Sequence, residues 1–481
     1  MRRAVCGLVL LCLTSACGSR RPPYAVPAPA EPPPPAFKEN ADWKTAEPAD
    51  VQLRGKWWEV YGDAQLNGLE ERIEVSSETL KRAQTQFLQA RAAIGIERAN
   101  LYPQVGVNPS ISSINASNTR PQSSGGGPVG EFLLPVDVSY EADVWGRVRD
   151  AVASSRAAAQ ASAADLETIR LSLHAELATN YFGLRGLDAE KRILDSAAVA
   201  FERALELTQN RFRGGVASQA DVAQAETILE TTRAQAIDVL IDRARLEHAI
   251  AALVGTSAST FSVPASPLET TPPVIPAGLP SELLERRPDV AAAERRVAAA
   301  NADIGVANAA YFPRLLMNAS AGLESGSLTR WITGASGFWS LGSTALVTAF
   351  DGGRRRAVSA QTQAAYDAQV AGYRDTVLRA VQEVEDNLAA LRLLEQEAQT
   401  QQRAVEAAER SLTLATIRYR GGVVTYLEVI AAQSAALDNQ RTAVALLARR
   451  LSSSVLLIKA LGGGWHAGML PVVSFPLPAS R

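Results

Sequence analysis

Two long stretches of the chain, residues 147–213 and 354–420, have the pattern of coiled-coil helices. Both are rich in Ala, Glu, Gln, Arg and Leu and contain no proline. In the second stretch, apolar residues alternate in steps of four and three: Val377, Val381, Val384, Leu388 and Leu391, and then Val405, Ala408, Leu412, Ala415 and Tyr419. At about 1.5 Å of rise per residue, each helix would reach roughly 100 Å. We therefore predict one continuous helix in each stretch.

Each long helix is predicted to end at a hairpin with the same local signals. Basic residues suit the negative end of a helix, and Gly-Gly supplies a left-handed C-cap. Ser or Thr three residues before an acid predicts a capping box, which opens a return helix over 218–255 or 425–462. The residues involved are Arg211, Arg213, Gly214, Gly215, Ser218 and Asp221, and then Arg418, Arg420, Gly421, Gly422, Thr425 and Glu428. Shorter helices over 64–100 and 289–311 would extend the return helices end to end.

Strict alternation of apolar and polar residues predicts a membrane strand over 134–144. Its apolar face comprises Leu134, Val136, Val138, Tyr140, Ala142 and Val144. Further strands are predicted within 104–115, 315–323 and 339–349, the last two with less regular alternation. Four strands cannot close a barrel, and open sheet edges are not tolerated in lipid, so we expect more than one chain. The alternative is a pair of soluble surface hairpins.

The chain repeats itself. Arg211-Phe-Arg-Gly-Gly-Val216 recurs as Arg418-Tyr-Arg-Gly-Gly-Val423, and the same shift carries Gly146-Arg147 onto Gly353-Arg354. Prolines are absent from 136–263 and 314–470 but cluster over 264–288, between the two copies. Because proline is costly inside helices, this placement indicates two long helical repeats joined by an irregular connector.

The first residues have the features of a lipoprotein signal. Arg2 and Arg3 precede an apolar run and a small-residue junction before Cys17, which predicts a signal peptide over 1–16 and acylation of Cys17. Thr14 stands where a large aliphatic residue is usual, so an ordinary signal peptide is the alternative. All three cysteines lie in this region, which excludes an intramolecular disulfide in the mature chain.

Composition narrows the possible functions. A net charge of -2 gives no global basic field for a nucleic-acid partner. No uninterrupted apolar run beyond residue 16 is long enough for a membrane-spanning helix. Only three methionines and three scattered histidines are present, and no nucleophile–base pair or phosphate loop is evident. We therefore expect no catalytic residues, no metal site and no cofactor, and hence no enzyme.

With these elements in place, the sequence closely resembles the TolC-like outer-membrane factors, in their lipoprotein, OprM/NodT-like branch. The resemblance covers about residues 17–465. It rests on Trp57-Trp-Glu-Val-Tyr-Gly-Asp63, Ala99-Asn-Leu-Tyr-Pro103, Asp143-Val-Trp-Gly-Arg147, Leu283-Leu-Glu-Arg-Arg-Pro-Asp289, Phe312-Pro313 and Phe350-Asp-Gly-Gly-Arg354. Arg-Pro-Asp followed by Ala293-Glu294 and then Phe-Pro is the most specific of these signals.

The resemblance implies a fold that is mainly α with membrane β. It predicts a homotrimer with a twelve-stranded β-barrel in the outer membrane, four strands from each chain, continuous with a periplasmic α-helical barrel. An equatorial belt would come from segments near 40–63, 256–280 and 463–475. The predicted organisation is a signal (1–16), a tether with equatorial segment (17–63), a first repeat (64–255), a connector (256–288), a second repeat (289–462) and a tail (463–481).

The resemblance also implies the function of an efflux duct. The hairpins at 211–221 and 418–428 would form the gated periplasmic tip that meets an adaptor protein, which links the duct to an inner-membrane pump of the RND type. The duct would conduct drugs or other small molecules passively, contributing to antibiotic resistance. Alternatives are a duct for type I protein secretion or metal efflux and, from another class, a periplasmic coiled-coil scaffold. The alternating strands argue against the scaffold.

Two tip residues have competing interpretations. Tyr419 resembles a tyrosine that holds the gate by bonding a neighbouring hairpin, but it also lies on the coiled-coil seam. Glu428 would cap its helix and could add to an inward ring of carboxylates. Val424 and Ala431 stand where related channels often have acids, which predicts a weaker ring.

Overall fold

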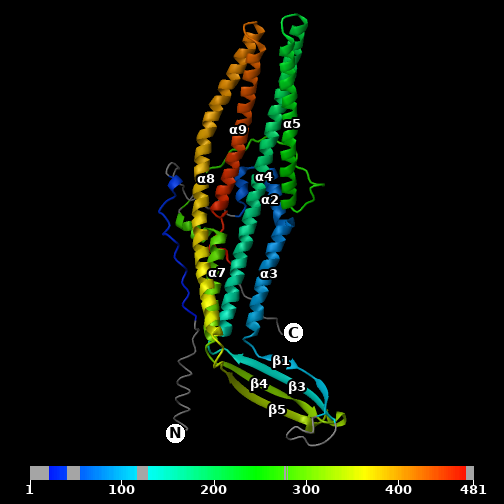
Figure 1. The fold of residues 1–481 in the computed structure, drawn as a ribbon, viewed down its shortest axis with the longest axis vertical. Helices are drawn as coiled ribbons and strands as arrows, with labels where there is room; N and C mark the ends of the chain where they lie inside the picture. Colours follow the sequence, from blue (N-terminus) through cyan, green and yellow to red (C-terminus); the bar gives the residue numbers. More distant parts are fainter. Residues whose placement is uncertain (1–20, 41–54, 116–127, 276–277, 279, 473–481) are drawn as a thin grey trace.

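A computed structural model of the chain describes residues 21–40, 55–115, 128–275, 278 and 280–472. The molecule is elongated, with two helical hairpins at one end and a small sheet at the other (Figure 1). The predicted signal peptide and Cys17 lie outside the described residues. Among the described helices, none is both long and apolar enough to cross a membrane.

The two predicted long helices are continuous over the expected bounds. Helix α4 spans Arg147–Arg213 and α8 spans Arg354–Arg420, each with 67 residues. Gly183 and Gly186 do not break α4. A Cβ at Gly186 would stand 2.9 Å from the Cβ of Ala448, so the glycine allows α4 to approach α9 closely.

The return helices pack beside the long helices, as predicted. Helix α5 (Gln219–Leu253) packs on α4, and α9 (Tyr426–Ala460) packs on α8. Two shorter helices, α3 (Glu78–Ala99) and α7 (Pro288–Ala309), continue towards the sheet along α4 and α8 (Figure 1). The repeat in the sequence is therefore a repeat in space.

The single helix predicted over 64–100 is wrong. The chain forms α2 (Ala64–Ser76) and α3, separated at Ser77, whose backbone is extended. The Ser77 hydroxyl accepts from the N–H of Leu80 and caps α3, and Asp63 caps α2 in the same way. The chain therefore forms two short helices, each with its own cap, in place of one helix. The Ser77 side chain can cap a new helix start, so the sequence does not require the helix to continue through it.

A glycine marks the same close approach in both repeats. Gly255 follows α5 and Gly462 follows α9, both with positive φ. A Cβ at Gly255 would lie 2.2 Å from the carbonyl oxygen of Ser76, and one at Gly462 would lie 2.0 Å from that of Arg286. The backbone before α3 and α7 thus occupies the space of a side chain, which only glycine leaves free.

The sheet is antiparallel. It contains β1 (Gln104–Val107), β2 (Ser110–Ile114), β3 (Val129–Ala142), β4 (Arg314–Ser325) and β5 (Gly337–Leu346), with β1 and β2 both beside β3. The strand predicted within 104–115 is thus interrupted at Asn108-Pro109, since proline lacks the N–H needed for a ladder. The strand predicted over 134–144 is β3, which begins earlier than predicted and ends before Val144.

The register of the sheet places apolar residues in rows across the strands. One row is Val105, Val138, Ala319 and Leu341, and the next is Val107, Val136, Ala321 and Trp339. Between them runs a row of Gly106, Asp137, Ser320 and Ser340. Since directly opposite residues share a face, the predicted apolar face is continuous over the sheet. Several of its members are exposed in the single chain, including Trp339 and Leu341.

The largest core lies midway along the molecule. There the short helix η2 (Trp57–Tyr61), α2 and the connector after α5 surround α4, α8 and α9. Trp57, Phe182 and Leu388 are buried in this core. The extended segment 21–40 runs along α7 and α8 (Figure 1), where Tyr24 contacts Glu294 and the N–H of Lys38 donates to Glu385.

Candidate functional site

The first hairpin, at the end of α4, is built by a helix stop followed at once by a helix start. The N–H of Gly215 donates to Phe212 O and that of Val216 to Arg211 O, the pattern of a Schellman motif. Gly215, with φ of 75°, supplies the left-handed residue, whereas Gly214 stays right-handed. Ser218 and Asp221 then form the predicted capping box.

The second hairpin repeats the stop but not the start. Gly422 has φ of 73° and the N–H of Val423 donates to Arg418 O, as in the first copy. The capping box predicted for Thr425 and Glu428 is wrong, because the Thr425 side chain makes no cap hydrogen bond. The Glu428 carboxylate instead lies 3.8 Å from Arg418 Nη1. The Glu428 side chain thus reaches back across the turn to the end of α8.

One arginine joins the two hairpins of the chain. Arg211 Nη1 donates to the main-chain carbonyl of Tyr419 at 3.0 Å, and its guanidinium lies 4.5 Å from the centre of the Tyr419 ring. The Tyr419 ring packs in turn on that of Tyr426, with centroids 5.3 Å apart. Arg211, predicted as a helix-end cation and as a residue of the gated tip, therefore links residues from the two repeats.

The two tyrosines form the small core of the tip. Both are buried, together with Ala225 and Val429, and the Tyr419 hydroxyl has no hydrogen-bond partner among the described residues. Burial raises the pKa of Tyr426 to about 12, so this hydroxyl stays neutral at physiological pH. The tip core is thus held by packing and by the Arg211 contact.

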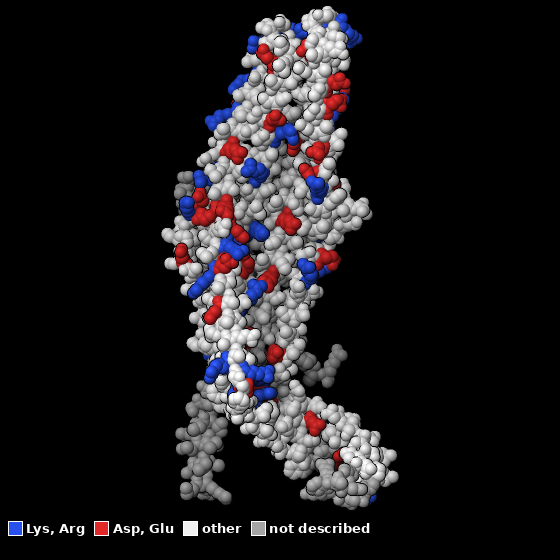
Figure 2. Space-filling model, viewed as in Figure 1, with Lys and Arg blue, Asp and Glu red and all other residues white. Residues whose placement is uncertain are grey.

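The outer surface of the tip is basic and apolar. Arg213, Arg418 and Arg420 are exposed there, as are Val216 and Val423 at the two turns. Charges of both signs are scattered along the helical part of the molecule, while few lie over the sheet on the face shown in Figure 2. Exposed valines beside arginines suit a surface that contacts another protein.

A groove lies between α4 and the α8–α9 pair. It encloses about 900 Å³ and is lined by apolar and amide side chains, among them Phe201, Val405, Leu437 and Gln440. Next to the groove, Arg441 on α9 forms an ion pair with Glu190 on α4, with 2.6 Å between Arg441 Nη2 and Glu190 Oε1. No sequence pattern marks this groove, because it arises where the two repeats pack side by side.

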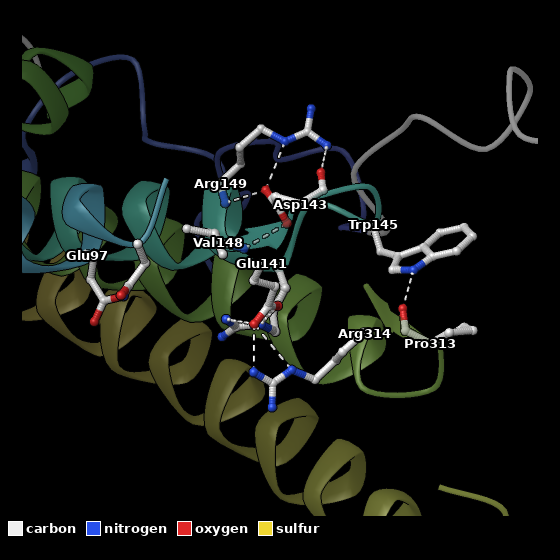
Figure 3. A network of polar contacts seen from close by, with 10 residues as sticks. Glu97, Glu141, Asp143, Trp145, Val148, Arg149, Pro313 and Arg314 are labelled. Atoms are coloured by element: carbon white, nitrogen blue, oxygen red, sulfur yellow. Dashed lines mark hydrogen bonds and ion pairs between the residues drawn. The ribbon is translucent and has the colours of Figure 1, made fainter. Parts of the chain in front are cut away.

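The junction between sheet and helices is a network of charges (Figure 3). Asp143 accepts from the N–H groups of Val148 and Arg149 at the start of α4, at 3.0 and 2.9 Å. Glu141 accepts from Arg314 at 2.7 Å and also from Arg147. The carboxylates thus stabilise the positive end of α4 and fix its direction relative to β3 and β4.

The second repeat has the same device. Asp351 accepts from the N–H groups of Gly353 and Arg355, at 3.0 and 3.2 Å, at the start of α8. Both Asp-to-Arg motifs carried the family resemblance, but no capping role was predicted for Asp143 or Asp351. In both motifs, an aspartate shortly before Gly-Arg at the start of a long helix is the sequence signal for this cap. In the part of the chain that the structure describes, no three His, Cys, Asp or Glu side chains are grouped as a metal site would require.

Comparison with known proteins identifies a single family, that of outer membrane efflux proteins. The model of the family described as outer membrane efflux protein matches residues 69–256 and 279–463. The chain is 32% identical over 477 residues to the pyoverdine export outer membrane protein OpmQ of Pseudomonas aeruginosa. This alignment covers 96% of this chain and 97% of OpmQ. It is 30% identical over 444 residues to the antibiotic efflux pump outer membrane protein ArpC of Pseudomonas putida, covering 91% of each.

The fold is similar to that of solved channels. The outer-membrane channel OprN superposes with a TM-score of 0.86 at 29% identity, covering 93% of this chain and 100% of that one.

Proposed function

The chain belongs to the outer membrane efflux protein family, and from this premise we propose that it is the outer-membrane channel component of a tripartite efflux pump. Its place is the cell outer membrane. The carrying observation is that relatives named for pyoverdine export and antibiotic efflux match nearly the whole chain. The duct conducts small molecules outward and does no chemistry of its own.

The channel is a homotrimer. Within the described residues, β1 and β2 form one free edge of the sheet and β5 forms the other. Unpaired edges are not stable in lipid, so copies of the chain join edge to edge into a closed barrel. With β1 and β2 counted as one interrupted strand, each chain contributes four strands, and three copies, the number in the family, give twelve with the apolar rows towards lipid. The twelve long and return helices form the periplasmic duct.

The hairpins form the gate and the adaptor contact. The predicted tip residues, from Arg211 to Asp221 and from Arg418 to Glu428, surround the end of the duct, and Arg211 holds the two hairpins of each chain together. The adaptor contacts the exposed turns and the groove beside α4. Opening separates the hairpins, with energy supplied by the inner-membrane pump.

Acylation of Cys17 adds a lipid anchor. Arg21 lies 3.9 Å from Asp150 in the first turns of α4, next to the sheet. Four residues of chain reach at most roughly 14 Å, so an acyl chain on Cys17 would be held near the membrane surface. Cys17→Ala should abolish labelling with palmitate, and labelling that survives this change would refute the anchor.

Export is tested in cells that lack their own outer-membrane efflux channel. Expression of this chain with its adaptor and pump should lower accumulation of a fluorescent dye, and a variant truncated at both hairpins should not. Unchanged accumulation, with normal expression in the outer membrane, would contradict the proposed function.

A further inference from the structure

A collar of aromatic and basic residues lies where the helices meet the sheet. The chain crosses this boundary four times: from α3 to β1, from β3 to α4, from α7 to β4 and from β5 to α8. Each crossing carries an aromatic residue and an arginine within a few positions. The aromatic residues are Tyr102, Trp145, Tyr311 and Phe350, and the arginines include Arg98, Arg147, Arg314 and Arg354. Basic side chains gather at this boundary on the face shown in Figure 2.

The aromatic residues of the collar mark a membrane surface. Tyr102 and Tyr311 are exposed, and Phe350 is 89% exposed. Trp145 stacks on Phe312, with ring centroids 4.9 Å apart. Membrane β-barrels carry girdles of aromatic residues at the level where their strands leave the lipid. The collar therefore lies at the surface of the membrane that holds the sheet.

In the first repeat, carboxylates neutralise the arginines of the collar. Asp143 Oδ2 lies 3.1 Å from Nε of Arg149. Glu141 is shared by Arg147 and Arg314, at 2.8 and 2.7 Å. The charges at the start of α4 are thus largely balanced within the chain.

The corresponding positions of the second repeat lack two of these acids. The shift that relates the repeats places Phe350 opposite Asp143 and Ala357 opposite Asp150. Helix α4 has Asp150 in its first turn, whereas the first turn of α8 has no acid. An exposed aromatic ring therefore stands where the first repeat has the carboxylate that pairs with its second arginine.

Two arginines at the start of α8 are left without a carboxylate. Arg354 and Arg356 are exposed, and among the described residues they make no hydrogen bond or ion pair. Cations are unfavourable at the positive end of a helix, so these two arginines do not serve the stability of α8. Positions two apart on a helix point about 200° apart, so in a wall one helix thick at least one of the two faces away from the lumen.

We propose that the collar binds the headgroup of an anionic phospholipid at the start of α8. Arg354 or Arg356 contacts the phosphate, and Phe350 lies at the level where the headgroup meets the acyl chains. A guanidinium matches a phosphate with two parallel hydrogen bonds, and basic residues are attracted to an anionic membrane surface. This inference rests on the proposed barrel, because the collar lies at a membrane surface only if the sheet is inserted.

Selective retention of lipid tests the proposal. The purified full chain in detergent is mixed with equal amounts of phosphatidylglycerol and phosphatidylcholine, which share a phosphodiester but differ in net charge. Native mass spectrometry counts the lipids that stay on the complex. We expect phosphatidylglycerol to be preferred at least about fivefold, the factor that one basic residue near a membrane surface contributes. Equal retention of the two lipids would overturn the proposal.

A competition with free anions distinguishes a lipid from inorganic phosphate. Phosphate should release no more phosphatidylglycerol than chloride does at the same ionic strength, because the acyl chains hold the lipid in place. Selective release by phosphate would overturn the assignment to a lipid, since the arginines would then bind the free anion.

A double variant tests the two arginines. Arg354→Gln combined with Arg356→Gln should remove most of the preference while the complex stays intact. Arg403→Gln combined with Arg410→Gln is the matched control, since both are exposed on the same helix, more than about 70 Å away. An unchanged preference in the first double variant would overturn the proposal. Dissociation of that variant into single chains would also overturn it, because the arginines would then pair with a neighbouring chain.

Phe350 offers a test by charge. Phe350→Asp should lower the preference for phosphatidylglycerol, because it supplies the carboxylate that the first repeat has at Asp143, whereas Phe350→Leu should keep the preference. Equal effects of the two substitutions would contradict the role of charge at this position.

The outcome can be separated from that of the proposed function, because lipid retention is measured on purified protein. Equal retention of both lipids by a chain that exports normally would refute the collar site alone. Selective retention by a chain that fails to export would refute the export function alone.

Discussion

Removing the Arg211 side chain should open the tip. In each chain, Arg211→Ala deletes a charge-assisted hydrogen bond to Tyr419 O and a guanidinium placed over the Tyr419 ring. Hydrogen bonds to charged groups contribute about 1.5–3 kcal/mol, and partial exposure reduces this to roughly 1–2 kcal/mol per chain. Over three chains the closed state would lose about 3–6 kcal/mol. Each 1.4 kcal/mol is tenfold, so the ratio of open to closed channels should rise at least about a hundredfold.

Single-channel recording in planar lipid bilayers measures this ratio directly. Arg213→Ala is the matched control, since Arg213 is a neighbouring tip cation that donates to Asn210 on its own helix. Arg211→Lys should give an intermediate result, because it keeps the charge but loses the planar guanidinium. If Arg211→Ala opens the channel no more often than Arg213→Ala, Arg211 is not the latch that we propose.

The remaining predictions concern stability and the tip. Asp221→Ala should lower the thermal midpoint by removing a capping box worth about 1 kcal/mol, whereas Glu428→Ala should change it little; equal losses would contradict the difference between the two caps. Gly462→Ala should destabilise the chain by more than about 1 kcal/mol, because its Cβ would meet the Arg286 carbonyl, and wild-type thermal stability in this variant would refute the contact. Burial raises the pKa of Glu70 to about 7. The pKa of His174 is also raised, because its hydrogen bonds to Glu70 and Glu74 outweigh the effect of burial, which lowers it. The folded state therefore binds more protons than the unfolded state, so thermal stability should fall as the pH rises from about 5 to 8. Glu70→Gln should make stability less dependent on pH over this range. An equal pH dependence in both proteins would contradict the part that Glu70 has in this proton binding.

Sequence periodicity predicted the long elements well because each carries its own signal. The ends of α4 and α8 follow from Arg-Gly-Gly, and their continuity follows from the absence of proline together with the coiled-coil periodicity. The apolar rows of the sheet follow from alternation in β3, which the neighbouring strands match in register. Such signals are local, so they survive without knowledge of the fold.

What the sequence could not predict depends on contacts between the repeats. The break at Ser77 replaces one capped helix with two of similar local stability, and packing against Gly255 favours the break. The Arg211 contact joins residues 208 positions apart. The groove beside α4 exists only after the two repeats are packed together. The capping box at Thr425 and Glu428 is absent, and the Glu428 carboxylate lies near Arg418 on the preceding helix instead.

The central claim is that the chain is stable in the membrane only as a closed oligomer that forms a duct. Native mass spectrometry of the protein released from outer membranes measures this most directly. We expect a complex of three chains that dissociates on heating. A folded single chain released from the membrane would contradict it, because the edges at β1, β2 and β5 would then have faced lipid unpaired.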